Sequence, residues 1–330
     1  MTKLTGWTAS LVALAATASA DVKINDYLSL TGYAAATGTY TDPDAGKNTS
    51  SLFNSGSPEY DVINAGLVGK YGDFGGKVSF LYTPTRANGN SGVLDLYATY
   101  TTGDFVVTAG NFLSWLGYES FYTPNMTQIT YAPDIFFIPA YHTGVKVDYT
   151  ASKTLTAGVA VVDSEFNTTA HGWAPYAQGD GHFDKFGTEA YVSYTGIDKL
   201  TLWAGFGYDQ NQAGGGQTVL GDVWASYALS STITLAAEVD YQEDLGSGYL
   251  TELQYAFSDK LSGIVRISGV HASSGETGSY FTVSPTYKLT SNFLVKAEVS
   301  YADAPEATIG TQGLLSGKGT IYAVQAVFTF

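Results

Sequence analysis

The chain has no cysteine, few basic residues and, after residue 20, no long apolar run. Without cysteine it can have no disulfide framework, no thiolate metal site and no cysteine nucleophile. Its 15 lysines and arginines stand against 30 acidic residues, a formal net charge of −15, so nucleic acid is a poor partner. A helix that spans a bilayer needs roughly 18 or more consecutive apolar residues, so no such helix is expected.

Glycine and aromatic residues are abundant instead. The 330 residues include 38 Gly, 25 Tyr and 17 Phe, only 14% of the chain is charged, and the mean hydropathy is close to zero, at +0.01. This composition is unusual for a cytosolic enzyme. It is typical of a membrane β-barrel, in which apolar residues facing the lipid alternate with polar residues facing the lumen.

The first 20 residues have the pattern of a secretory signal. Lys3 supplies a positive charge, residues 11–16 are apolar, and small residues from Ala18 to Ala20 form a cleavage site. The apolar segment is too short to anchor the chain in a bilayer. We therefore expect a cleaved signal peptide over residues 1–20 and a single mature domain over residues 21–330. Together with a barrel, the signal indicates the outer membrane of a Gram-negative-type bacterium.

The last ten residues alternate strictly between two faces. Successive side chains of a strand point to opposite sides, so one face of this segment is wholly apolar and the other is mixed. Such a segment suits the closing strand of an outer-membrane barrel, where the last strand pairs with the first and no edge stays open. The apolar face consists of Tyr322, Val324, Ala326, Phe328 and Phe330.

The same alternation recurs along the chain and predicts an all-β fold, a transmembrane antiparallel up-and-down barrel of about 16 strands. Turns of two or three residues follow the even-numbered strands, whereas most connections after odd-numbered strands are long. Outer-membrane barrels have this asymmetry; a soluble sandwich or propeller predicts neither it nor the apolar outward rows. The expected strands cover residues 27–40, 59–71, 74–84, 93–101, 104–112, 139–149, 153–163, 185–195, 199–208, 217–229, 232–242, 247–257, 260–270, 277–288, 292–301 and 321–330.

Residues for catalysis or metal binding form no recognisable motif. The histidines His142, His171, His182 and His271 make no pair at metal-ligand spacing. Residues 180–184 alternate oxygen and imidazole ligands but supply too few of them, so we interpret them as a polar surface loop. An outer-membrane hydrolase would need a Ser–His or Asp–His pair at the rim, and nothing identifies one. We expect no metal, no cofactor and no enzymatic activity.

Charged side chains at alternate strand positions are predicted to face the lumen. Acids gather on the strands between residues 185 and 257, and bases on the strands after residue 260 and between residues 59 and 84. We hypothesise an acidic wall facing a basic arc, a field that orients polar solutes and biases ion selectivity. The alternative is that these positions simply face water and tolerate any charge. The assignment also depends on the register, because a shift by one residue would turn each strand inside out. The predicted pore-lining residues are Lys70, Lys77, Asp95, Lys146, Asp148, Glu189, Asp222, Glu238, Asp240, Glu252, Arg266, Lys288, Lys296 and Glu298.

The connection over residues 113–138 is unusually rich in aromatic and apolar residues. So many of them would be costly on a loop exposed to water. We therefore expect the loop to fold into the lumen, as a constriction or as a plug, rather than to pack on a neighbouring barrel. The candidate constriction residues are Trp115, Tyr118, Glu119, Tyr122 and Asn125.

This region also carries a family resemblance. The stretch "GNFLSWLGYES", a following "PN" and then "AYHTGVKVDY" resemble the β-barrel porins of the OmpL-like group, the family often called β-barrel porin-2. The matching positions are Gly110, Gly117, Glu119, Asn125 and residues 142–145. The specific sequence motif covers residues 110–149, and the similarity in overall strand arrangement extends over the mature chain. The resemblance implies an outer-membrane pore for small solutes, without naming a substrate or any catalytic residue.

The sequence therefore predicts an outer-membrane porin, in contact with outer-membrane lipid, that lets small hydrophilic solutes or ions diffuse passively and prefers cations. At about 16 strands the lumen is wide enough for water. The alternatives are a structural or surface-binding barrel plugged by the 113–138 loop and, third, an outer-membrane hydrolase. The oligomeric state is not readable from the sequence; a homotrimer is one candidate, since trimers are common among porins of this size.

Overall fold

The computed structural model describes residues 21–44, 46–52, 60–84, 90–164, 177–178, 186–210, 216–243, 245–304 and 317–330. The predicted signal peptide, His171, and residues 180–184 with His182 lie outside these ranges. No helix within the described ranges is long and apolar enough to cross a bilayer.

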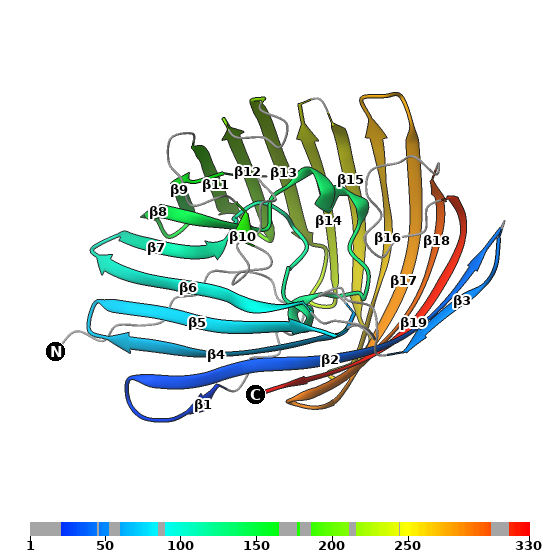
Figure 1. Ribbon diagram of the computed structural model, residues 1–330, viewed down its shortest axis with the longest axis horizontal. Coiled ribbons are helices and arrows are strands. Elements are labelled where there is room, and N and C mark those ends of the chain that lie inside the picture. Colours follow the sequence, from blue (N-terminus) through cyan, green and yellow to red (C-terminus); the bar gives the residue numbers. More distant parts are fainter. Residues whose placement is uncertain are drawn as a thin grey trace.

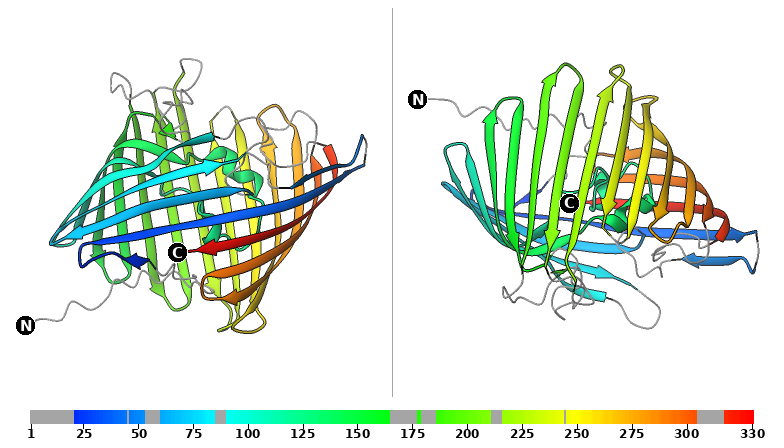
Figure 2. Two further views of the ribbon diagram at one scale, coloured as in Figure 1. Left: turned by 60° about the horizontal axis from the view of Figure 1, so that its bottom comes forward. Right: turned by 90° about the horizontal axis from the view of Figure 1, so that it is seen from above.

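Sixteen of the nineteen described strands form the wall of a closed barrel (Figures 1 and 2). Each wall strand pairs antiparallel with its neighbours. The wall strands are β2 (Leu28–Pro43), β4 (Val62–Tyr71), β5 (Phe74–Thr83), β6 (Asn90–Thr102), β7 (Phe105–Leu113), β8 (Tyr141–Ser152), β9 (Leu155–Val162), β11 (Gly187–Ile197), β12 (Leu200–Asp209), β13 (Thr218–Ala228), β14 (Ile233–Gln242), β15 (Gly246–Ala256), β16 (Leu261–Ala272), β17 (Thr277–Thr290), β18 (Phe293–Ala304) and β19 (Gly317–Thr329). Three short strands accompany them: β1 (Val22–Lys23), β3 (Thr49–Leu52) and β10 (Ala177–Gln178).

The last wall strand closes the barrel on the first. β19 pairs antiparallel with β2 from Thr329 opposite Tyr33 to Gly319 opposite Pro43. Beyond the strand end, the backbone groups of Phe330 and Gly32 exchange two hydrogen bonds of 2.9 Å. The predicted closing strand, the count of sixteen and the antiparallel order are confirmed.

Three connections that the sequence predicts as loops contain further structure; one of them, between β9 and β11, includes β10, which pairs parallel with β8. Residues 41–58 include the end of β2 and the strand β3. β3 pairs with residues Gly38 to Thr41 of β2 and so satisfies backbone groups of β2 that lie beyond its pairing with β4. The 113–138 connection starts after β7, spans residues 114–140 and contains two 3₁₀ helices, η1 (Thr123–Asn125) and η2 (Pro133–Phe137). Each has a proline in its first turn, where the missing N–H has no intrahelical partner to lose.

The alternation in β14 shows how the wall separates two environments. Leu235, Ala237 and Val239 are exposed on the outside, whereas Glu238 and Asp240 are buried on the inside. Outward aromatic rings pair near the short turns, Phe74 with Tyr100 at 5.0 Å between centroids and Phe105 with Tyr149 at 4.6 Å. An apolar outer face edged by aromatic rings is the surface that a bilayer requires.

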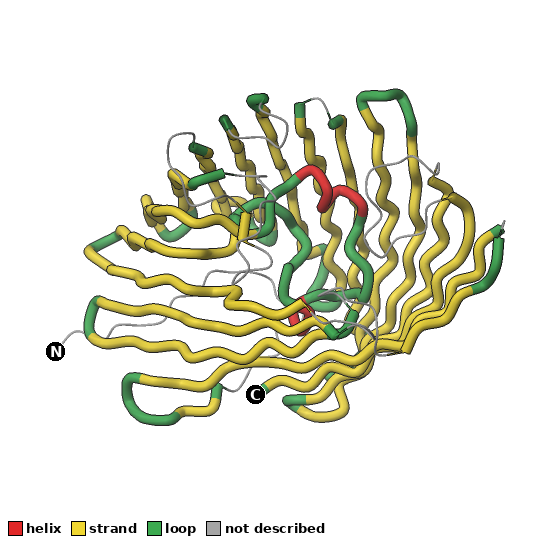
Figure 3. Tube along the Cα trace, viewed as in Figure 1, coloured by secondary structure: helices red, strands yellow, loops and turns green. Residues whose placement is uncertain are grey.

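Residues 114–140, named here the lumen loop, lie inside the ring of strands (Figure 3). The expected inward folding is confirmed by the contacts of the loop with inward-facing side chains of the wall. Phe121 and Tyr122 of the loop pack on an apolar cluster of buried wall residues. That cluster consists of Tyr33, Ala35, Val62, Leu81, Leu94, Tyr141, Leu294 and Val327.

Candidate functional site

The acidic wall holds the first part of the lumen loop through its backbone. Glu189 Oε1 accepts from the N–H of Trp115 at 2.7 Å, and Asp222 Oδ2 from Gly117 at 2.6 Å. Glu238 Oε1 accepts from Tyr118 at 2.6 Å. These three wall residues come from β11, β13 and β14, so the start of the loop runs along one side of the barrel, with one backbone donor to each carboxylate. Charged acceptors make the stronger hydrogen bonds in such a setting.

The second part of the loop is held by one acid and one base of β18. Glu298 Oε2 accepts from the N–H of Ile129 at 2.6 Å and from that of Thr130 at 3.2 Å. Lys296 Nζ donates to the carbonyl oxygens of Thr123, at 2.9 Å, and Gln128, at 3.1 Å. Carboxylates therefore bind loop donors and the ammonium group binds loop acceptors, which satisfies backbone groups that have no strand partner.

Arg266 of β16 links the two parts of the loop. Its guanidinium group, almost completely buried, forms an ion pair with Glu119 and donates to the carbonyl oxygen of Thr130 at 2.8 Å. Glu119 also accepts from the N–H of Ala132 at 2.7 Å. Glu252 of the neighbouring β15 accepts from the loop hydroxyl of Thr127 at 3.0 Å. Hydrogen bonds thus surround most of the ion pair, as a buried pair needs, although Arg266 Nε is buried without a partner.

Tyr122 attaches the loop to the opposite wall. Its hydroxyl group lies 2.6 Å from that of Tyr141 and 3.0 Å from Asp95 Oδ1. Lys77 Nζ forms an ion pair with Asp95 Oδ2 at 2.8 Å and lies 4.7 Å from the centre of the Tyr122 ring. Burial, followed by the charge of Asp95, raises the pKa of Tyr122 well above its ordinary value. The phenol therefore stays neutral and can donate to the carboxylate.

Trp115 is surrounded by a third set of predicted residues. Lys146 Nζ lies 4.8 Å from the Trp115 ring and donates to the carbonyl oxygen of Leu113 at 3.1 Å. Tyr191, whose ring centroid lies 4.7 Å from that of Trp115, donates from its hydroxyl group to Asp148 at 2.9 Å. The inward charges on this side pack against the start of the loop.

The structure brings together most of the predicted site residues, but not all of them. Lys70 and Lys288 face inward near the short turns, and Lys70 is exposed. Asn125 of the loop is also exposed, while its N–H donates to the carbonyl oxygen of Tyr122. The buried predicted residues are Asp95, Glu189, Asp222, Glu238, Asp240, Glu252, Arg266, Lys296 and Glu298. Most of these charges therefore contact the lumen loop, and their role in lining a pore stays a prediction.

Sequence reasoning missed several residues of this site. Ser114 donates to Glu189 Oε2 at 2.7 Å, and His142 Nε2 lies 2.9 Å from the same oxygen. Asp134 of η2 is buried beside β14. The signal for Asp134 was an acid within the otherwise apolar stretch 131–140. Because Ser114 donates to the carboxylate of Glu189 and not to His142, these residues do not form a serine–histidine relay.

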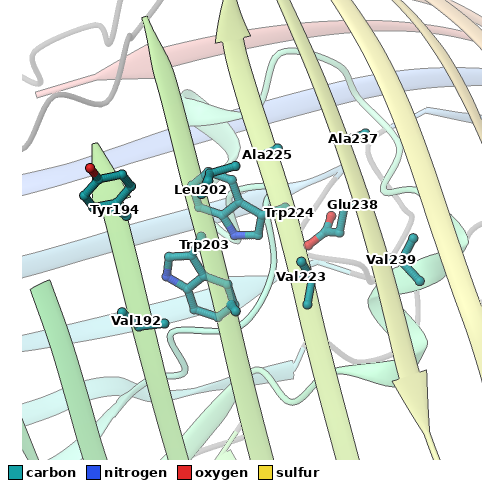
Figure 4. Close-up of a pocket in the computed structure, with 11 residues that line it drawn as sticks. Val192, Tyr194, Leu202, Trp203, Val223, Trp224, Ala225, Ala237, Glu238 and Val239 are labelled. Carbon is teal, nitrogen blue, oxygen red and sulfur yellow. The ribbon is translucent and has the colours of Figure 1, made fainter. Parts of the chain in front are cut away.

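A shallow depression of about 420 Å³ lies on β11 to β14 (Figure 4). Its rim includes the outward apolar residues Val192, Leu202 and Val223, and Trp224 and Glu238 of the inward-facing row also border it. Its outward apolar lining is that of a lipid-facing surface, so we do not interpret it as a solute site.

A closed sixteen-stranded barrel with an apolar outer face, a charged inner face and a loop folded into its lumen defines an outer-membrane porin architecture. The chain belongs to the family described as "Putative beta-barrel porin-2, OmpL-like", whose model matches residues 27–330. The family resemblance of the 110–149 segment is thereby confirmed. No curated protein sequence matches the chain significantly.

Solved porin structures share the fold at low sequence identity. OprB of Pseudomonas putida, in a structure at high pH, superposes with a TM-score of 0.71 at 10% identity, covering 92% of this chain and 94% of that one. An anion-selective porin from Comamonas acidovorans gives 0.67 at 13%, covering 92% and 99%. OmpF of Salmonella typhi, in complex with daunomycin, gives 0.66 at 14%, covering 94% and 100%. At these identities the likeness establishes the fold alone.

Proposed function

We propose that the protein is a passive porin for small hydrophilic solutes or ions, with a preference for cations. The observation that carries this proposal is the lumen loop, which is attached to charged residues on both sides of a closed barrel. Such a loop narrows the passage without closing the wall. The loop then limits the size of the solute, because a solute has to pass through the space between the loop and the strands.

The preference for cations rests on the inward charges. Acids outnumber bases among the predicted pore-lining residues, eight against six. Charged side chains around a pore bias its ion selectivity by their sign. Asn125 and Lys77, which are not fully buried, are our candidates for residues in contact with the passing solute.

Further features of the proposal concern targeting, assembly and chemistry. We infer export through the signal pattern of residues 1–20 and assembly as a homotrimer in outer-membrane lipid. The proposal includes no catalytic step, no cofactor and no nucleic-acid partner. Crosslinking of the protein in native membranes, followed by gel electrophoresis, tests the trimer: a ladder that stops at three supports it, and a single monomer band contradicts it.

Single-channel current across a planar bilayer, with a salt gradient to give the reversal potential, tests the function. Steady conductance with a potential that favours cations would support the proposal in full. Conductance with a potential that favours anions would retain the pore and overturn the preference for cations.

A plugged barrel is the second candidate, and the number of strands that bind the loop favours it. Backbone groups of the loop are bound from β11, β13, β14, β16 and β18. This candidate predicts no conductance from protein that is folded by the criterion of heat-modifiable mobility in a gel. The same bilayer experiment therefore separates the two.

A further inference from the structure

Three buried carboxyl groups converge where the lumen loop meets β14. Asp134 of η2, Glu238 and Asp240 each place one carboxylate oxygen within 4.8 Å of the other two. Glu238 and Asp240 are two positions apart on one strand and so share its inward face. Asp134 comes from the loop, more than one hundred residues earlier in the chain.

A glycine of the wall leaves room for the lumen loop to approach these acids. Gly248 of β15 lies directly opposite Asp240 in the strand register. A Cβ atom at Gly248 would lie 2.5 Å from the Cα atom of Asp134, closer than real atoms approach. The absence of a side chain at Gly248 is therefore what lets Asp134 reach the two acids of β14.

The oxygens of this group supply an observation separate from their clustering. Both carboxylate oxygens of Asp240 are enclosed and accept no hydrogen bond from outside the acidic group, and the same holds for Asp134 Oδ2; Asp240 meets the carboxyl group of Asp222, and Asp134 that of Glu238. Asp222 of β13 lies opposite Asp240 in the register and outside the converging three, and its buried Oδ1 likewise has no donor from outside the acidic group. Buried carboxylates without donors are costly unless a positive charge or a proton compensates them.

The basic side chains nearby are already bound elsewhere. Arg266 pairs with Glu119 and donates to Thr130, and Lys296 donates to two loop carbonyl groups. Asp134, Asp222 and Glu238 each give one oxygen to a backbone N–H of the loop. The remaining oxygens are the ones that a ligand with positive charge would take.

We propose that Asp134, Glu238 and Asp240, supported by Asp222, bind a calcium ion that ties the lumen loop to the barrel wall. The donor set consists of oxygen alone, which suits a hard cation and not zinc or copper, which favour nitrogen and sulfur. Ca²⁺ takes six to eight oxygens in flexible geometry, whereas Mg²⁺ requires a strict octahedron and keeps several waters. One ion would therefore link η2, β13 and β14.

Binding is tested on the refolded full-length protein in detergent, after removal of metal with EDTA. Isothermal titration with Ca²⁺ is expected to give one ion per barrel, with a dissociation constant of about 1 mM or tighter. Asp240→Asn and Asp134→Asn are expected to weaken binding about tenfold or more. Asp259→Asn, in an exposed turn, is the matched control and is expected to bind as the native protein does.

Terbium luminescence locates the ion independently. Tb³⁺ replaces Ca²⁺ at oxygen sites and emits when a nearby indole transfers excitation energy to it. Trp224 lies opposite Glu238 in the register, and both are labelled in Figure 4. Trp224→Phe is expected to reduce the Tb³⁺ emission at least twofold while leaving Ca²⁺ affinity unchanged.

Several results would overturn the calcium site. No saturable binding up to about 10 mM Ca²⁺ would mean that the carboxyl groups are compensated by shared protons only. Equal affinity in Asp240→Asn and Asp259→Asn would place any bound ion elsewhere, and tighter binding of Mg²⁺ than of Ca²⁺ would overturn the choice of ion. Heat-modifiable gel mobility checks the fold of every variant. Asp134→Asn, which alters the loop and not the wall, decides the test if Asp240→Asn does not fold.

Discussion

The backbone N–H of Ile129 donates to Glu298 Oε2 at 2.6 Å, across 169 positions of the chain. The wall thus binds the main chain of the lumen loop here, in addition to its contacts with the side chains of Glu119, Tyr122 and Thr127. The same relation holds between Tyr118 and Glu238. It follows that the position of the loop is determined by charges on the strands, and that wall substitutions are the direct way to release it.

Replacement of Glu298 with alanine is expected to loosen the second part of the loop. The N–H groups of Ile129 and Thr130 would lose a charged acceptor in a buried place, at a cost of about 2–3 kcal/mol. If the protein is a porin, single-channel conductance and current noise should both rise. Asp259→Ala, which removes an exposed acid from a turn, should leave both unchanged. An unaltered current in Glu298→Ala would contradict the anchoring role.

The pair Arg266–Glu119 should show strong coupling in a double-mutant cycle. Arg266→Met leaves the carboxylate of Glu119 buried and unpaired, which we expect to lower the free energy of unfolding by about 3–5 kcal/mol. Adding Glu119→Gln removes the stranded charge and should restore part of that loss. Denaturant unfolding in lipid vesicles, followed by tryptophan fluorescence, measures the cycle. Additive losses in the two single variants would show that the ion pair is not coupled.

The barrel itself could be predicted from the sequence, because its signals are local. In β14, alternate residues from Leu235 to Tyr241 are apolar, and this period of two identifies both the strand and its inward acids. The closing strand at the C-terminus shows the same pattern. The pairing of β3 with β2 was not predictable, because residues 49–52 have no such alternation and gain their order only from the neighbouring strand.

The site was predictable only in its parts. Alternation placed Glu238 and Glu298 on the inside, and the aromatic content of the loop placed the loop there too. Which donor meets which acid could not be predicted, since the partners Tyr118 and Ile129 lie 120 and 169 positions away from those acids. Asp134 was missed for the same reason: its neighbours in sequence are apolar, and its acidic neighbours come from β14.

Gly248→Ala is expected to displace η2 from the wall. The new methyl group would meet Asp134 at Cα and Phe137 at its ring, 2.5 and 2.8 Å away, so the loop has to shift. Overpacking of this kind costs about 1–3 kcal/mol, measurable by denaturant unfolding in vesicles. Gly221→Ala in β13 is the control, because its new Cβ atom would meet only a backbone oxygen at 4.0 Å. Equal stability of the two variants would argue against close docking of η2.

Docking of the lumen loop is expected to weaken as the pH rises. Burial, followed by the charge of Glu119, raises the pKa of Asp134 from 3.8 to about 8, while Arg266 acts in the opposite direction. The acids Glu238 and Asp240 face it from β14. In the docked loop Asp134 keeps its proton, whereas in a released loop, exposed to water, Asp134 loses it above about pH 4. Each pH unit between about 4 and 8 therefore favours release by up to about 1.4 kcal/mol, and above pH 8 the effect is constant.

Single-channel recordings between pH 5 and pH 9 in the presence of EDTA test this dependence. For a conducting barrel, current noise should rise with pH in the native protein and stay flat in Asp134→Asn, which cannot ionise. Asp259→Asn should follow the native curve, because that acid is exposed and far from the loop in sequence. If a calcium ion occupies the site, millimolar Ca²⁺ should suppress the rise, since the ion then compensates the charge that the proton otherwise neutralises. If the current noise of Asp134→Asn rises with pH as it does in the native protein, another group is responsible for the pH dependence.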